Sequence, residues 1–158
     1  MKYNLIKLSS FINSPILFNF YFESIFLGIE QLTTEYPNFF NWYHKTVREG
    51  ILNKERDLLL VTVDYYIAGV AILKKTSTEK KICTLRVTNR FQRLGVGKFL
   101  FLKSFEYLDT EYPLITVSST REYQFNKLFR YFNFKKESEL VNWYLPYRTE
   151  ITYNGILI

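Results

Sequence analysis

The sequence predicts an α+β domain with a mixed, largely antiparallel sheet of about six or seven strands, flanked by about four helices. Strand-like segments in the middle of the chain are joined directly, whereas later ones are joined through helices. The chain has 158 residues, of which 47% are hydrophobic, and such a chain can bury a core of its own. We therefore expect residues 1–158 to form a single domain that needs no metal or disulfide.

The first part of the chain begins with alternating apolar residues in 2–8, which predict a strand. Pro15 follows a capping serine and opens a helix that we expect from 16 to about 32. This segment is apolar nearly all round, so the helix should be largely buried. A second helix is expected from 38 to 51, where aromatic residues recur at helical spacing.

The remaining chain begins with a meander, because short polar turns separate three strand-like segments. After the meander, strands alternate with helices. The expected elements are strands at 57–63, 67–74 and 81–87, a helix at 96–108, a strand at 113–118, a helix at 121–131, a strand at 137–144 and a last strand after Pro146.

Composition limits the classes of function. A single cysteine, Cys83, excludes an intrachain disulfide and fits the reducing cytoplasm, where we expect the protein to be. No signal-peptide pattern is visible, and no apolar stretch approaches the roughly 20 residues of a membrane span. The formal net charge of +6 is spread along the chain and would attract a polyanion, of which a phosphorylated cofactor is the least demanding. Nucleic acid is not expected as a partner, except tRNA as the carrier of an acceptor, because no nucleic-acid-binding motif is visible.

A glycine-bearing loop between a strand and a helix is the strongest local signal. It reads Gln92-Arg93-Leu94-Gly95-Val96-Gly97-Lys98 and follows an apolar strand that ends in Leu85-Arg86-Val87. Free N–H groups at a helix start form an anion site, and glycines let a phosphate approach the backbone. The loop lacks the third glycine of a dinucleotide fingerprint and the Gly-Lys-Ser/Thr ending of a P-loop. By itself it predicts a phosphate site of another kind.

Gln-x-x-Gly-x-Gly after a strand ending in Leu-x-Val resembles the acetyl-CoA signature of the GCN5-related N-acetyltransferase (GNAT) superfamily. Residues 82–100 carry this match, and Leu128–Phe134 resembles more loosely the helix ending Leu-Tyr-x-Lys-x-Gly-Phe of that family. The element order and the chain length also match. The resemblance implies a sheet that splays between the strand ending at Val87 and the strand ending at Ser118, with the acetyl-CoA thioester in the V between them.

The resemblance also implies which residues hold acetyl-CoA. The backbone of Leu85 and Val87 would pair with the pantetheine arm. Asn126, on the next helix, either hydrogen-bonds the cofactor or is a solvated helix residue. The pyrophosphate would lie against the loop residues Gln92, Arg93, Leu94, Gly95, Val96, Gly97 and Lys98.

Two catalytic positions depart from the family pattern. The usual tyrosine acid corresponds to Phe129, which has no proton to donate, and the usual glutamate base falls near Lys81. Tyr123 precedes Phe129 by nearly two helical turns and could share its face, so it is an acid candidate, as is Tyr144 on the late strand. His44, the only histidine, is a base candidate if the second helix lines the acceptor site.

The predicted function is an N-acetyltransferase that moves an acetyl group from acetyl-CoA to a primary amine by direct attack in a ternary complex. The acceptor is a small amine, a protein amine or an aminoacyl-tRNA. The alternatives are a catalytically weak domain that binds CoA and acts by interaction, which the missing tyrosine and glutamate favour, and a nucleic-acid-binding module, which only charge favours. The aromatic residues after Trp143 are a candidate dimer edge.

Overall fold

The computed structural model describes residues 2–30 and 35–157, and their seven strands form one sheet in the order β1-β2-β3-β4-β5-β7-β6. All neighbouring strands are antiparallel except β4 and β5, which are parallel. The mixed, largely antiparallel sheet is therefore confirmed. The strands are β1 (Asn4–Lys7), β2 (Arg56–Val63), β3 (Tyr66–Lys75), β4 (Lys80–Val87), β5 (Leu114–Ser118), β6 (Lys136–Val141) and β7 (Thr149–Tyr153).

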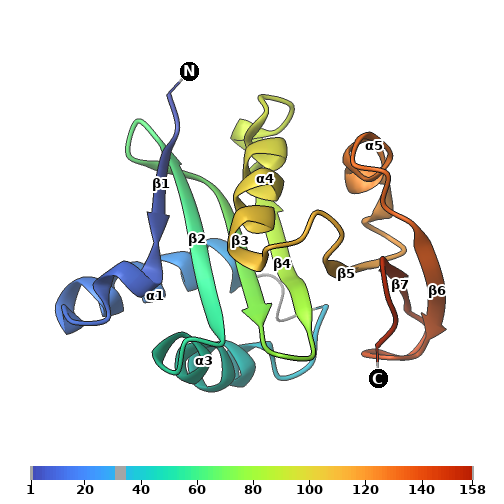
Figure 1. Ribbon diagram of the computed structural model, residues 1–158, viewed down its shortest axis with the longest axis horizontal. Helices are drawn as coiled ribbons and strands as arrows, with labels where there is room; N and C mark the ends of the chain where they lie inside the picture. The colour runs from blue at the N-terminus through green and yellow to red at the C-terminus, as the bar shows by residue number, and fades with distance from the viewer. Residues whose placement is uncertain (1, 31–34, 158) are drawn as a thin grey trace.

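Helices cover both faces of the sheet (Figure 1). The helices α4 and α5 share one hydrophobic core with the sheet, and α1 shares a second core with the helical segment α2-η3-α3. The helical elements are η1 (Leu8–Phe11), α1 (Pro15–Ile29), α2 (Phe39–Asn41), the π-helical η3 (Trp42–Val47), α3 (Arg48–Leu52), η4 (Asn89–Phe91), α4 (Val96–Leu108) and α5 (Glu122–Tyr131).

The continuous apolar run of β2 follows from this two-sided burial. Successive strand residues point to opposite faces, so Leu59 and Val61 enter the core under α4 while Leu58 and Leu60 enter the core under α1. A strand covered on both faces has no polar side, which is why the sequence alternation expected of a half-buried strand is missing here.

The expectation that the first helix is largely buried is wrong. Phe18, Phe22 and Ile25 face the sheet and are buried, but Ile16 and Phe20 are 86% and 63% exposed. A single helix layer lying on a sheet has only one covered face, whatever residues occupy the other. The structure ends α1 at Ile29, and the predicted continuation to 32 lies partly outside the described residues.

The C-terminal strands differ from the expectation in detail. The strand β6 ends at Val141 rather than at Tyr144, which lies in the connection to β7. That connection also exposes Trp143 and Tyr147, so the candidate dimer edge is solvent-facing but stays a prediction. The last strand, β7, is present and lies between β5 and β6 in the sheet.

Candidate active site

The sheet opens in its middle, between β4 and β5. These strands are paired only at Lys81 with Leu114 and at Ile82 with Ile115, and beyond that point they diverge (Figure 1). Where pairing stops, β4 carries a bulge: Ile82 and Thr84 pair with successive residues of β3, and Cys83 is the extra residue. A bulge bends its strand and increases the local twist, so it accounts for the departure of β4 from β5.

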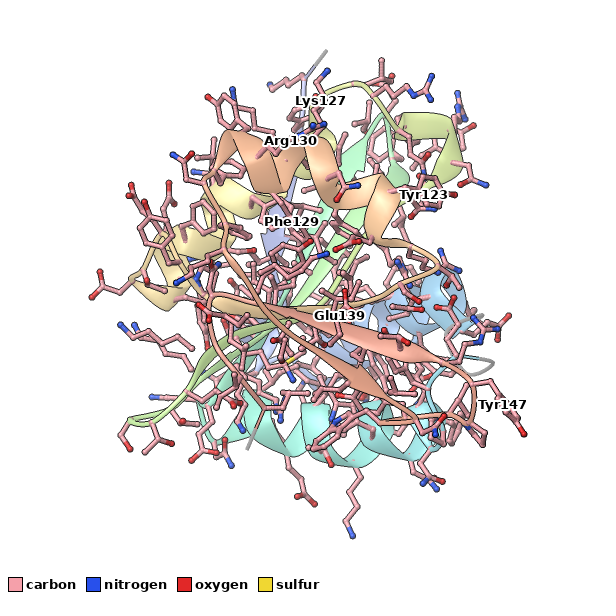
Figure 2. All side chains as sticks on the ribbon, turned by 90° about the vertical axis from the view of Figure 1, so that its right-hand side faces the viewer. Tyr123, Lys127, Phe129, Arg130, Glu139 and Tyr147 are labelled. Carbon is pink, nitrogen blue, oxygen red and sulfur yellow. The ribbon has the colours of Figure 1, made fainter. Side chains whose placement is uncertain are left out.

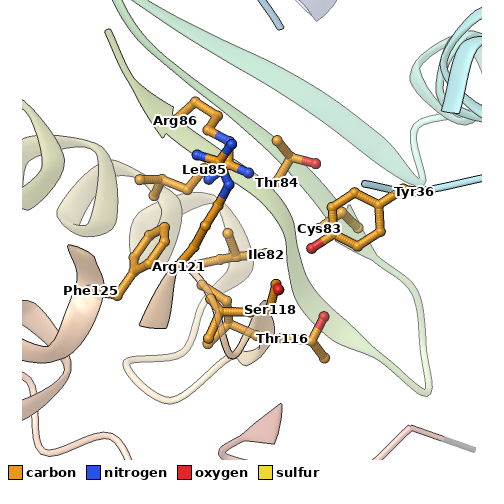
Figure 3. Close-up of a pocket in the computed structure, with 12 residues that line it drawn as sticks. Tyr36, Ile82, Cys83, Thr84, Leu85, Arg86, Thr116, Ser118, Arg121 and Phe125 are labelled. Carbon is orange, nitrogen blue, oxygen red and sulfur yellow. The ribbon is translucent and has the colours of Figure 1, made fainter. Parts of the chain in front are cut away.

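The divergence forms a cleft that is open to solvent, with about 380 Å³ of unfilled space that includes part of that solvent. Backbone and side chains of β4 line one wall, and β5 with the start of α5 lines the other (Figure 3). The lining residues are Tyr36, Ile82, Cys83, Thr84, Leu85, Arg86, Ile115, Thr116, Val117, Ser118, Arg121 and Phe125. The splay implied by the resemblance is therefore present, and Leu85 lies on its wall.

The N-terminus of α4 follows directly after β4 and η4. Gly95 is the N-cap residue with φ of 86°, and no side chain caps the helix. The first-turn N–H groups have no acceptor within the helix, and Gly95 lies on an exposed surface. A Cβ on Gly97 would lie 3.1 Å from Leu128 of α5, so this glycine allows α5 to pack closely against the first turn. An open helix end of this kind attracts anions through its free N–H groups and the helix dipole.

Contacts within the chain hold this loop in place. The Gln92 side-chain amide donates to the Val87 carbonyl at 3.3 Å and to Asn89 Oδ1 at 3.2 Å. The Tyr3 hydroxyl donates to the carbonyl of Leu94. Lys98 Nζ lies 4.3 Å from the centre of the Tyr131 ring, which keeps its charge beside the helix start. Gln92 therefore stabilises the loop through hydrogen bonds within the protein.

A second set of side chains continues the cleft toward β7. Glu35, Tyr36, Ser118, Tyr144, Arg148 and Glu150 line this part. The Tyr36 hydroxyl donates to Glu150 Oε1 at 3.2 Å, and the Tyr36 ring packs edge-on against Tyr144. Burial raises the pKa of Glu150, and hydrogen bonds from Thr116 and Tyr36 oppose the rise. Burial also raises the pKa of Tyr144, so its phenol stays protonated at neutral pH.

Glu35 joins the two walls of the cleft. Its Oε1 accepts from Arg121 Nε at 2.6 Å and its Oε2 accepts from Arg86 Nη2 at 3.1 Å. Arg86 belongs to β4 and Arg121 immediately precedes α5, so one carboxylate links β4 to the start of α5. Burial lowers the pKa of Arg86, and the charge of Arg121 lowers it further.

Comparison with known proteins finds similarity at the level of structure. A putative GNAT-family acetyltransferase from Desulfovibrio desulfuricans is 18% identical, with a TM-score of 0.60 over 74% of this chain and 80% of that one. A putative streptothricin acetyltransferase from Bacillus anthracis, solved with acetyl coenzyme A, is 17% identical, with a TM-score of 0.58 over 69% and 67%. The ribosomal-protein-S18-alanine N-acetyltransferase from Escherichia coli is 17% identical, with a TM-score of 0.55 over 63% and 68%.

The chain has the GNAT fold. No protein-family model matches the sequence, and no curated protein matches it. The similarity therefore lies in the element order and in the open pair of β4 and β5. The sequence identities are too low to assign an acceptor or a residue role to this chain.

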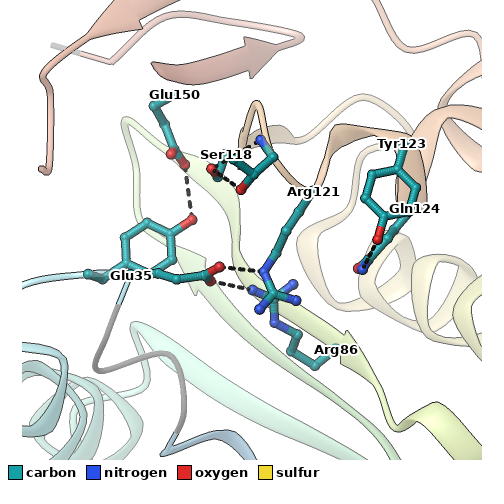
Figure 4. A network of polar contacts seen from close by, with 9 residues as sticks. Glu35, Arg86, Ser118, Arg121, Tyr123, Gln124 and Glu150 are labelled. Atoms are coloured by element: carbon teal, nitrogen blue, oxygen red, sulfur yellow. Dashed lines mark hydrogen bonds and ion pairs between the residues drawn. The ribbon is translucent and has the colours of Figure 1, made fainter. Parts of the chain in front are cut away.

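The GNAT fold places the predicted catalytic residues in different parts of the molecule. Tyr144 lines the cleft beside Glu150. Tyr123 is 71% exposed on α5 and contacts Gln124 (Figures 2 and 4). His44 contacts Glu23 at 3.1 Å, on the side of the sheet covered by α1. Neither Tyr123 nor His44 lines the cleft.

The predicted cofactor residues surround the cleft and the α4 terminus. Arg93 has φ of 63° and Leu94 is 48% exposed, whereas Val96 is buried under the sheet. Asn126 is exposed on α5. Phe129 is 2% exposed in the core beside Tyr153, so α5 turns no polar group toward the cleft at that position.

Sequence reasoning missed Glu35, Tyr36, Arg121 and Glu150. Glu35 and Arg121 are separated by 86 residues, and no local pattern connects them. Glu150 carried a usable signal: it is a charged residue within a short strand-like run, Thr149–Tyr153, and such a residue is buried only when it has partners.

Within the described residues, no helix is long and apolar enough to cross a bilayer.

Proposed function

We propose that this protein is an acetyl-CoA-dependent N-acetyltransferase of the GNAT type, a single domain that acts on a primary amine. One observation supports this most strongly: the strand that borders the cleft, β4, leads within a few residues into an uncapped helix N-terminus. A CoA thioester has a pyrophosphate at one end and the reacting carbonyl at the other, and this arrangement offers a place for each. The structures of similar fold include one solved with acetyl coenzyme A and one with CoA.

The residues present fit such a ligand. The pyrophosphate would lie against the N–H groups from Leu94 to Lys98, because Gly95 and Gly97 place no Cβ there. The edge of β4 after Ile82 has no paired strand, so its backbone groups are available to the amides of the pantetheine arm. The acetyl thioester supplies the electrophile.

Glu150 is the proposed general base. It is buried and hydrogen-bonded by Tyr36, and a raised pKa makes its carboxylate a stronger base than one in water. In the reaction, the acceptor nitrogen bonds to the acetyl carbon, its proton passes to Glu150, and the C–S bond breaks. Tyr144 is the proposed donor to the leaving sulfur, since its phenol is protonated and lines the same cleft.

Binding of acetyl-CoA, measured by titration calorimetry, tests the cofactor assignment. Gly95→Glu should abolish binding, because Gly95 has a positive φ that disfavours side chains and the new carboxylate would repel a phosphate. Gly28→Ala is the matched control, since an added Cβ there meets open space. Unchanged affinity in Gly95→Glu would contradict the phosphate site. Tight binding of CoA without turnover of any amine would contradict the enzymatic function and favour the alternative, a domain that only binds CoA.

A further inference from the structure

Two arginines converge in the cleft from opposite walls. The guanidinium groups of Arg86 and Arg121 lie close together, and each binds one oxygen of Glu35 (Figures 3 and 4). The Arg86 side chain is 16% exposed and the Arg121 side chain 30%. Two guanidinium groups aimed at one carboxylate form a site whose geometry fits an oxyanion, because their donors are fixed in planar forks.

The cluster has more donors and more positive charge than Glu35 satisfies. One carboxylate stands between two cations, and one residue of each charge, Arg148 and Glu150, lines the adjoining part of the cleft. Arg86 Nε is buried and has no acceptor within the described part of the chain. A buried N–H without an acceptor is costly, so this pair of arginines has capacity for a second anionic group.

The position of the cluster relates it to the acceptor. It lies where β4 and β5 have diverged, on the side of the cleft that continues through Ser118 toward Glu150. Glu35 reaches this point from the segment before α2, and its carboxylate accepts hydrogen bonds from the two arginines. A cationic group would be repelled by the arginines, whereas a carboxylate would replace or join that of Glu35.

We infer that Arg86 and Arg121 form a carboxylate subsite, and that the acceptor is an amine that carries a carboxylate, such as a free amino acid. This inference rests on the proposed acetyl transfer and specifies its acceptor. Glu35 occupies the subsite in the absence of acceptor. Arg86 and Arg121 are specificity-determining residues, while the proton transfer remains with Glu150.

Paired acceptors test the inference. Initial rates of thiol release from acetyl-CoA are measured with each of a panel of amino acids and with its carboxamide. The acid should exceed its amide in kcat/KM by about tenfold or more for the best acceptors, as expected when a buried charge pair is made with one and not the other. Arg121→Gln should abolish this ratio by raising KM for the acids alone. Glu35→Gln should lower KM for the acids, because the neutral side chain at position 35 no longer competes with the acceptor carboxylate for the two arginines.

Arg130→Gln is the matched control, since Arg130 is an exposed arginine on α5, the helix that Arg121 precedes (Figure 2), and its loss should leave the ratio unchanged. Equal rates for acids and amides in the wild-type protein would overturn the inference while acetyl transfer stands. If no amine is turned over, the proposed function fails, and titration of the same pairs into the CoA complex decides the subsite. Tighter binding of acids that depends on Arg121 would support it, and equal binding would overturn it.

Discussion

Glu150 combines three properties that a catalytic base needs. It is 5% exposed, it lines the cleft, and hydrogen bonds from Tyr36 and Thr116 hold its carboxyl group in place. The charged groups around it come from several elements: Glu35 before α2, Lys81 on β4, and Arg148 before β7. Burial outweighs them, so the carboxyl group is a poorer acid than one in water.

Replacement of this carboxyl should separate catalysis from folding. Glu150→Gln keeps the oxygen that accepts from Tyr36, so the fold should persist, but kcat should fall by about 10²- to 10⁴-fold because no base remains. Glu139→Gln on neighbouring β6 is the matched control, since that carboxylate is exposed (Figure 2). Steady-state rates with a fixed amine give the comparison, and equal rates for the two variants would contradict the assignment.

The same residue should make stability depend on pH. The pKa of Glu150 is raised above its ordinary value of 4.5 in the folded protein, so the stability contributed by its neutral form is present below that value and is lost as pH rises through the folded pKa. Glu150→Gln is neutral throughout. The free energy of unfolding of the variant should therefore gain on that of the wild type as pH rises across this window, measured by urea unfolding. A difference that stays constant with pH would exclude the raised pKa.

At the scale of elements, the contact between α4 and β3 sets where the proposed phosphate loop lies. A Cβ on Gly69 of β3 would come within 2.7 Å of Leu100 and 2.9 Å of Val96. The helix therefore lies directly against the backbone of the strand. Small residues at such a contact let two elements approach more closely than ordinary side chains allow.

Enlarging Gly69 should push α4 away from the sheet. Gly69→Val should lower the free energy of unfolding by about 1–3 kcal/mol, the usual cost of overpacking, and should weaken CoA binding through displacement of the helix start. Chemical denaturation and calorimetry report the two effects. In contrast, Gly28→Ala in α1 should raise stability by roughly 0.5–1 kcal/mol, because alanine has the higher helix propensity and meets open space there. Equal stability of Gly69→Val and the wild type would show that α4 is not in contact.

Secondary-structure elements were predicted from the sequence better than burial or the order of the strands in the sheet. The loop Gln92–Lys98 and the helix after it obey local rules of glycine conformation and helix starts, and the hairpin strands have clear apolar runs, so both could be recognised without tertiary knowledge. The exposed face of α1 could not, because apolar residues on both sides of a helix conceal which side is covered. The place of β7 between β5 and β6 depends on long-range pairing that no local pattern encodes.

At the scale of the whole molecule, the proposed active site depends on distant segments meeting at one bulge. Cys83 in β4 opens the sheet, Glu35 arrives from before α2, and Glu150 arrives from the C-terminal strand. The sequence predicted a cofactor site that runs from Leu85 to Lys98 and includes Asn126, and this assignment stays a prediction. The acceptor half is assembled from residues far apart in the chain, and only the fold brings them together.

Release of thiol from acetyl-CoA is the most direct test of acyl transfer at this cleft. With acetyl-CoA alone, the protein should release no thiol, because the acetyl group passes directly to the acceptor. When the amine is added, free thiol and acetylated amine should appear in equal amounts. Thiol release without amine, with the acetyl group retained on the protein, would contradict direct transfer; absence of release with every amine would contradict the enzymatic function itself.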